Sequence, residues 1–131
     1  MIQMKYTALV TILAVAVTFY FSARVGIGRA KLGIDAPAMT GNPTFDRTFR
    51  VHANTVEQIV LFLPVLWLST AVVGDVWAAA IGVLWVIGRL IYARGYVAEA
   101  DKRGPGMLVT LASTAVLSLV SIWGIIQALT A

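Results

Sequence analysis

Cysteine is absent from this chain of 131 residues, and histidine occurs once, at position 52. Metal centres in proteins usually combine several histidine, cysteine and carboxylate ligands. His52 therefore lacks the partners for a metal site within one chain, and we expect no metal. The glycines form no phosphate-binding loop and no dinucleotide fingerprint, and we interpret Gly104-Pro105-Gly106 as a turn.

Charge is also scarce, at 12% of residues against 60% hydrophobic residues. A soluble domain of this size would have too little polar surface to cover itself. Charge-free runs cover residues 6–23, 58–74, 76–88 and 104–131. A helix rises about 1.5 Å per residue, so the first, second and fourth runs are long enough to cross a hydrocarbon core about 30 Å thick. The third run becomes long enough if Arg89 is included in the helix.

The fold class that follows is an all-α integral membrane protein, a four-transmembrane-helix bundle. We expect a single membrane domain over residues 1–131, with helices over about 5–29, 45–73, 76–102 and 105–129.

The basic residues indicate the orientation in the membrane. Near the connection between the first two helices lie Arg24, Arg29, Lys31, Arg47 and Arg50. Toward the connection between the last two lie Arg89, Arg94, Lys102 and Arg103, and Lys5 alone lies on the other side. The positive-inside rule places both connections in the cytoplasm. The pI near 9.9 then reports topology and contact with anionic membrane lipids, and we expect no nucleic-acid partner.

Two polar faces approach this membrane surface. Arg50, Asn54 and Glu57 share one face of the second helix, at spacings i, i+4 and i+7. A stripe on the third helix, with spacings of 3, 4, 3 and 4, contains Arg89, Tyr92, Tyr96, Glu99 and Arg103. The two helices are antiparallel neighbours, so the faces can meet, and we predict an ion pair between Arg89 and Glu57.

Simpler roles exist for several of these residues. The predicted ion pair could only hold two helices together. The tyrosines could be interfacial aromatics, as we expect in part for Trp67, Trp77 and Trp85. For Arg47, Arg94 and Lys102 we expect contacts with lipid headgroups. These roles do not explain why cations, an amide, an acid and phenols gather at one membrane face. Guanidinium groups bind carboxylates, and a carboxylate binds an ammonium, so the mixture favours a charged, peptide-like ligand.

Two motifs carry a family resemblance. The first is Phe45-x-Arg47-x-x-Arg50-x-x-x-Asn54-x-x-Glu57, followed by Leu61-Phe62-Leu63 and Leu66-Trp67; the second is Arg89-x-x-Tyr92-x-x-Gly95-Tyr96, followed by Arg103. In these motifs the chain resembles the MAPEG family, membrane-associated proteins in eicosanoid and glutathione metabolism. The resemblance implies a homotrimer that binds glutathione at each subunit interface.

The resemblance also implies roles for individual residues. Glutathione contacts from one subunit would be Arg50, Asn54, Glu57, Tyr92 and Tyr96, and Arg29 would reach in from the neighbouring subunit. His52 is a further expected glutathione contact. Arg103 would be the catalytic residue that holds the glutathione sulfur as a thiolate. His52, Gln58 and Ala30 depart from the family pattern, and Ala30 replaces an arginine proposed to act on a lipid epoxide.

A cation beside a thiol, whose ordinary pKa is about 8.5, favours the reactive thiolate. We therefore expect a glutathione transferase that attacks a hydrophobic electrophile from the bilayer, with glutathione peroxidase activity on lipid hydroperoxides as a second reaction. Glutathione is present in the cytoplasm, and the chain is short, with 131 residues. Both favour a location in a bacterial inner membrane, with the site facing the cytoplasm.

Two alternatives of other classes remain open. One is a non-enzymatic lipid-binding protein of the same fold, against which the retained Arg50, Glu57, Tyr92 and Arg103 argue. The other is a small multidrug or cation transporter. Such transporters place an essential acid in the first helix, and none occurs there.

Overall fold

The computed structural model describes residues 3–131 as four long helices. They are α1 (Lys5–Leu32), α2 (Pro43–Val73), α3 (Asp75–Ala98) and α4 (Gly104–Thr130), with a short 3₁₀ helix, η1 (Ala100–Arg103), before α4. All four are long and apolar enough to cross a membrane. The prediction of an all-helical chain with four spans is confirmed.

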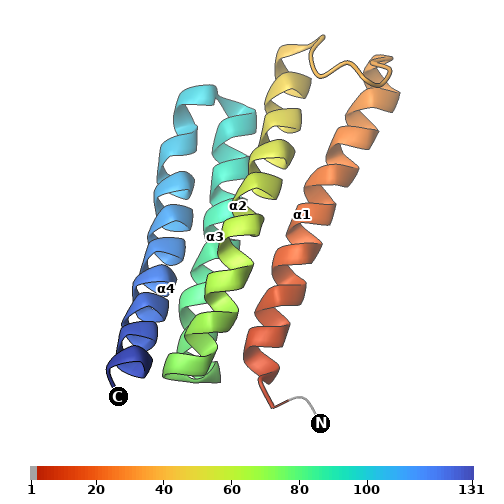
Figure 1. Cartoon of the computed structure of the whole chain (residues 1–131). Helices are drawn as coiled ribbons and strands as arrows, with labels where there is room; N and C mark the ends of the chain where they lie inside the picture. The colour runs from red at the N-terminus through yellow and green to blue at the C-terminus, as the bar shows by residue number, and fades with distance from the viewer. Residues whose placement is uncertain (1–2) are drawn as a thin grey trace.

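The helices run up and down side by side (Figure 1). The α1–α2 loop and η1 lie at one end of the bundle, and the start of α1 and the end of α4 lie at the other. Gly74 alone separates α2 from α3, with a φ of 86° that favours glycine. The two basic connections therefore lie at the same end, as the charge pattern predicts.

The predicted third helix, over 76–102, is too long. It ends at Ala98, because Glu99 adopts an extended conformation with φ −158° and ψ 129° before η1 begins. Gly104-Pro105-Gly106 is not a separate turn, since α4 starts at Gly104. A proline fits the first turn of a helix because its missing N–H has no intrahelical partner there.

An apolar core joins all four helices. Ala14, Phe62, Leu66, Trp85 and Leu117 are each fully buried, and the Trp85 ring stacks on Phe62 with centroids 4.5 Å apart. The expectation that Trp85 lies partly in the interfacial belt is wrong, because its indole fills the space between α2 and α3.

Buried hydroxyl groups connect the helices where lipid offers no hydrogen-bond partner. Ser69 donates to the Leu117 carbonyl at 2.7 Å, and Ser113 donates to the Ile81 carbonyl at 2.8 Å. The Asp75 carboxylate accepts the Tyr6 and Thr7 backbone N–H groups at 3.0 and 2.7 Å. These N–H groups open α1 and have no partner in their own helix, so Asp75 fastens the start of α1 to α3.

Small residues set the closest helix contacts. A Cβ atom at Gly88 would lie 2.8 Å from the Thr110 hydroxyl and 2.9 Å from its backbone nitrogen, so α3 approaches α4 without an intervening side chain. Such approach favours van der Waals packing between membrane helices.

We predict that Gly88→Ala destabilises the bundle by about 1–3 kcal/mol, because the added methyl group has to displace the α4 backbone. The measurement is the free energy of unfolding in mixed micelles. Gly26→Ala is the matched control, because a Cβ at Gly26 meets no atom within 4 Å. Helix propensity alone should stabilise that variant by about 0.5–1 kcal/mol. Equal effects of the two substitutions would contradict the packing argument.

Candidate functional site

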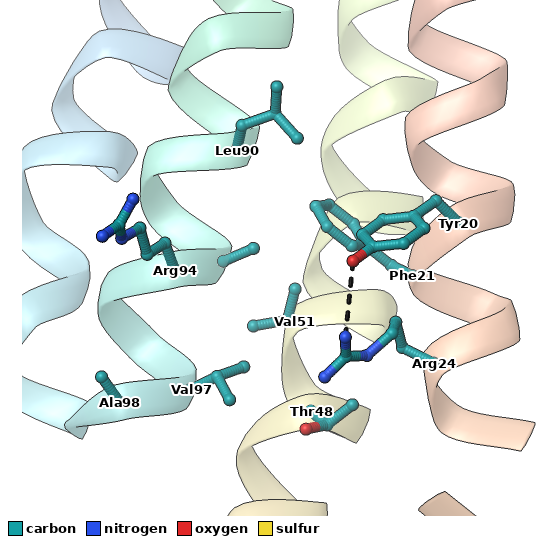
Figure 2. Close-up of a pocket in the computed structure, with 10 residues that line it drawn as sticks. Tyr20, Phe21, Arg24, Thr48, Val51, Leu90, Arg94, Val97 and Ala98 are labelled. Carbon is teal, nitrogen blue, oxygen red and sulfur yellow. Dashed lines mark hydrogen bonds between the residues drawn. The ribbon is translucent and has the colours of Figure 1, made fainter. Parts of the chain in front are cut away.

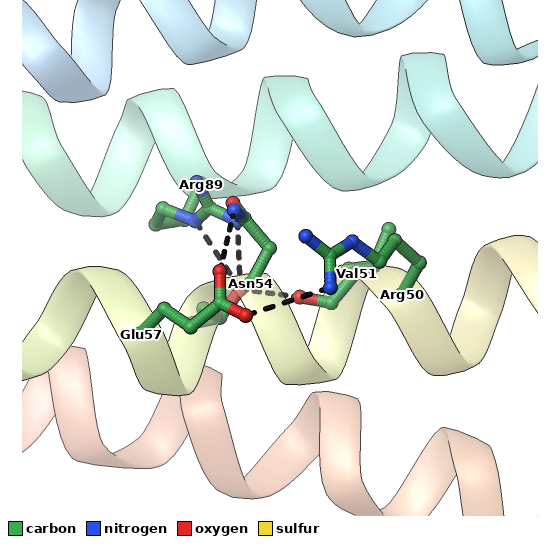
Figure 3. Close-up of polar contacts among 6 residues, drawn as sticks. Arg50, Val51, Asn54, Glu57 and Arg89 are labelled. Carbon is green, nitrogen blue, oxygen red and sulfur yellow. Dashed lines mark hydrogen bonds and ion pairs between the residues drawn. The ribbon is translucent and has the colours of Figure 1, made fainter. Parts of the chain in front are cut away.

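The polar face of α2 is assembled as its spacing predicts. Arg50 Nη1 lies 3.5 Å from Glu57 Oε1, and Asn54 Nδ2 donates to Glu57 Oε2 at 3.3 Å (Figure 3). The Arg50 and Glu57 side chains are each 54% exposed. Both charged groups can therefore still accept a ligand.

Arg89 does not form the predicted ion pair with Glu57. Its Nη2 donates to Asn54 Oδ1 at 3.0 Å and to Thr55 Oγ1 at 2.9 Å, and its Nε also donates to Thr55, at 3.2 Å. Asn54 lies between the two charged groups, offering its oxygen to Arg89 and its nitrogen to Glu57 (Figure 3). An amide can do both, which a carboxylate or a guanidinium cannot.

An aromatic column continues this network toward η1. The Arg89 guanidinium lies 4.1 Å from the centre of the Tyr92 ring, and Tyr92 stacks on Tyr96 with centroids 5.5 Å apart. The Arg103 guanidinium lies 5.5 Å from the centre of the Tyr96 ring. Cations are attracted to aromatic faces over such distances. One chain of contacts, which we call the polar network, thus runs from Arg50 through Arg89 to Arg103.

Arg103 reaches the network from η1, not from the third helix. Its side chain is exposed, and its Nη1 donates to the Ala100 carbonyl at 3.3 Å. Glu99, the other predicted member of the stripe beyond α3, instead pairs with Lys102 at 2.9 Å. The stripe therefore loses Glu99, because the backbone leaves the helix at that residue.

Two glycines make this corner possible. A Cβ at Gly95 would overlap the Lys102 carbonyl, and one at Gly106 would overlap the backbone of Tyr92. The chain can therefore fold back so that Arg103 meets Tyr96. Neither glycine was predicted to position the site. The sequence signals were a glycine beside Tyr96 and the second glycine of Gly104-Pro105-Gly106, three residues after Arg103.

Arg29 and His52 are not part of the polar network within one chain. Arg29 donates to the Ile34 and Ala38 carbonyls at 3.3 and 2.7 Å, and its guanidinium lies 5.3 Å from the Phe45 ring centre. It thus holds the α1–α2 loop. His52 is half-buried on α2, and no hydrogen bond links it to the residues described.

Arg47 makes a hydrogen bond that links two helices. Its Nε donates to the Val97 carbonyl at 3.0 Å, one of the last carbonyls of α3, and its side chain is half-buried. Such carbonyls have no partner in their own helix. Arg47 therefore joins the start of α2 to the end of α3.

A cavity of about 420 Å³ lies between α1, α2 and α3 (Figure 2). Its apolar lining consists of Phe21, Val51, Leu90, Ala93, Val97 and Ala98, and its polar lining of Tyr20, Arg24, Thr48 and Arg94. No side chain of the polar network lines it. The cavity and the network are separate features of the same end of the bundle.

The sequence of the chain is similar to those of known proteins. The model of the MAPEG family matches residues 7–123. The chain belongs to the MAPEG family. Human microsomal glutathione S-transferase 2 is 36% identical over 118 residues, which cover 90% of this chain and 80% of that protein.

Two other relatives extend this similarity. Bovine leukotriene C4 synthase is 34% identical over 101 residues, covering 77% of this chain and 67% of the synthase. An uncharacterized protein of Synechocystis sp. is 40% identical over 115 residues, covering 88% of this chain and 84% of that protein. This MAPEG chain is thus an integral membrane protein of a glutathione-related transferase family.

We predict that Thr55→Val destabilises the protein by about 2 kcal/mol, because the buried Arg89 guanidinium loses the acceptor of two hydrogen bonds. Thr110→Val is the control. Thr110 is equally buried, but its hydroxyl donates to the Gly106 carbonyl of its own helix. Unfolding in mixed micelles measures both. A Thr55→Val variant no less stable than the control would mean that Arg89 does not depend on Thr55.

Proposed function

We propose that this MAPEG protein is a glutathione transferase that activates the glutathione thiol beside Arg103. The observation that carries the proposal is the polar network, which ends in an exposed arginine held against Tyr96. Family membership supplies the substrate class.

The network offers complementary groups for two charged parts of glutathione, one carboxylate and the ammonium. Arg50 provides a guanidinium for a carboxylate, and Glu57 provides a carboxylate for the ammonium. Asn54 is held on both sides, by Arg89 and Glu57, and Tyr92 is held between Arg89 and Tyr96. Such groups are positioned before the ligand arrives, which lowers the entropic cost of binding.

Arg103 would then act on the sulfur. Its positive charge favours the thiolate, and the thiol proton passes to water. The sulfur donates an electron pair to an electrophilic carbon, so that a C–S bond forms while the carbon's bond to its leaving group, or to an epoxide oxygen, breaks. A lipophilic electrophile would enter from the bilayer, beside which the network lies.

The same thiolate supports a second reaction, on lipid hydroperoxides. Attack of sulfur on the terminal peroxide oxygen gives the lipid alcohol and a glutathione sulfenic acid. A second glutathione then forms the disulfide and releases water, so that two thiols are oxidised for each peroxide reduced.

A homotrimer would complete the site, and we include it in the proposal. Arg50 and Glu57 are half-exposed although they belong to a spanning helix, where uncovered charge is costly. A neighbouring subunit would cover them and bring Arg29 to the ligand. We also propose a bacterial inner membrane as the location, with the site on the cytoplasmic side, where the positive-inside rule expects the basic connections.

Arg103→Ala should leave glutathione affinity nearly unchanged and lower turnover by about 100-fold, as expected when one charge-stabilising donor is removed. The ultraviolet difference absorbance of thiolate, followed as glutathione is titrated into purified protein, should be saturable in the wild type and absent in the variant. Lys102→Gln, which removes the neighbouring charge, is the control. A folded wild type without any thiolate signal would favour the non-enzymatic lipid-binding alternative.

Mixing two inactive variants tests the shared site. If Arg29 and Arg103 act from different subunits, co-expressed Arg29→Ala and Arg103→Ala chains should regain about one quarter of wild-type turnover, because half of the positions on each side of an interface are intact. If Arg29 only holds its own loop, mixing restores nothing and the Arg29→Ala variant is simply less stable.

A further inference from the structure

A groove separate from the polar network runs along α1 at the basic end of the bundle. The cavity of about 420 Å³ meets a second hollow of about 290 Å³ between the end of α1 and the start of α2. Arg24 and Thr48 line both hollows, so the two form one groove.

The two halves of the groove differ in chemistry. The deeper half is mainly apolar, with Phe21, Leu90 and Val97 in its lining, and it also contains Arg94. The shallower half contains Lys31 and opens beside the α1–α2 loop. Apolar lining at depth with cations near the surface matches the division of a phospholipid into acyl chain and headgroup.

The cations of the groove retain most of their donors. The one hydrogen bond that Arg24 makes within residues 3–131 is to the Tyr20 hydroxyl, at 3.5 Å. Figure 2 shows its guanidinium beside Thr48, where the two halves meet. The described ion pairs do not involve Arg24 or Lys31. Both cations can therefore bind an anion.

The spacing of these cations fits the membrane surface. Arg24 and Lys31 lie two turns apart on α1, which separates them by about 10 Å along the helix axis. The headgroup region on one side of a bilayer is about 5–8 Å thick. A lipid whose headgroup reaches Lys31 would therefore have its phosphate and the start of its acyl chains near Arg24.

We propose that this groove binds an anionic phospholipid, with one acyl chain in the apolar half and the phosphate at Arg24 and Thr48. Lys31 binds the outer part of the headgroup. Basic pockets between membrane helices bind anionic lipids through the same combination of charge and apolar contact. The proposal does not depend on glutathione chemistry, because the groove shares no side chain with the polar network.

Native mass spectrometry of the purified full chain tests the proposal. The probes are phosphatidylglycerol and phosphatidylcholine with identical acyl chains. Wild type should bind phosphatidylglycerol at least about tenfold more tightly, and Arg24→Gln with Lys31→Gln should weaken it about 30-fold, the effect of two surface cations. Phosphatidylcholine has the same phosphate but no net headgroup charge, so its binding should weaken by less than about threefold.

Three variants serve as controls. Lys102→Gln removes a cation of the same membrane face outside the groove, so it should change phosphatidylglycerol affinity less than about twofold. If the double variant does not fold, Arg24→Lys with Lys31→Arg keeps both charges and should retain the lipid preference. Ala93→Phe fills the deeper half and should weaken both lipids equally.

Three outcomes would overturn the proposal. The first is equal binding of the two lipids by the wild type. The second is an Ala93→Phe variant with unchanged lipid binding but a higher KM for a lipophilic electrophile, which would make the groove the electrophile site. The third is a change in subunit number on charge removal without any change in lipid binding, which would make it a contact between copies of the chain.

Discussion

The polar half of the bundle depends on the buried guanidinium of Arg89. A charge at this depth needs hydrogen-bond partners, because lipid supplies none. Thr55 and Asn54 supply acceptors from α2, and the Tyr92 ring covers the guanidinium from α3. The same contacts fix the side chains of Asn54 and Tyr92, which are buried and in turn support Glu57 and Tyr96. The group that holds two helices together therefore also shapes the site.

A second constraint is the close approach of backbones where α3 meets η1 and α4. Gly95 and Gly106 leave room for the chain to reverse within a few residues. Arg103 then returns to Tyr96, although the helix that carries Tyr96 has ended. Because Tyr92 contacts Arg89 and stacks on Tyr96, the two tyrosines connect Arg89 to Arg103. A buried cation, Arg89, and an exposed cation, Arg103, thus belong to one network.

The two sides of α3 have different surroundings. One side faces α2 and carries the polar network, and another faces the groove beside α1. Arg24 and Lys31 on the groove side make few contacts within the chain, whereas Arg29 and Arg47 are engaged with loop and helix-end carbonyls. The excess of cations at this end therefore divides into residues that hold the fold and residues that remain available to anions.

Composition and spacing determined the four spans and the grouping of Arg50, Asn54 and Glu57, since membrane thickness and helical periodicity leave few alternatives. They did not reveal that Arg89 bonds Asn54 and Thr55 in place of Glu57, nor that the third helix ends at Ala98. Hydrogen-bond partners and chain reversals depend on which side chains fill the space between neighbouring helices. Spacing along one helix carries no information about that space, so only the tertiary structure decided them.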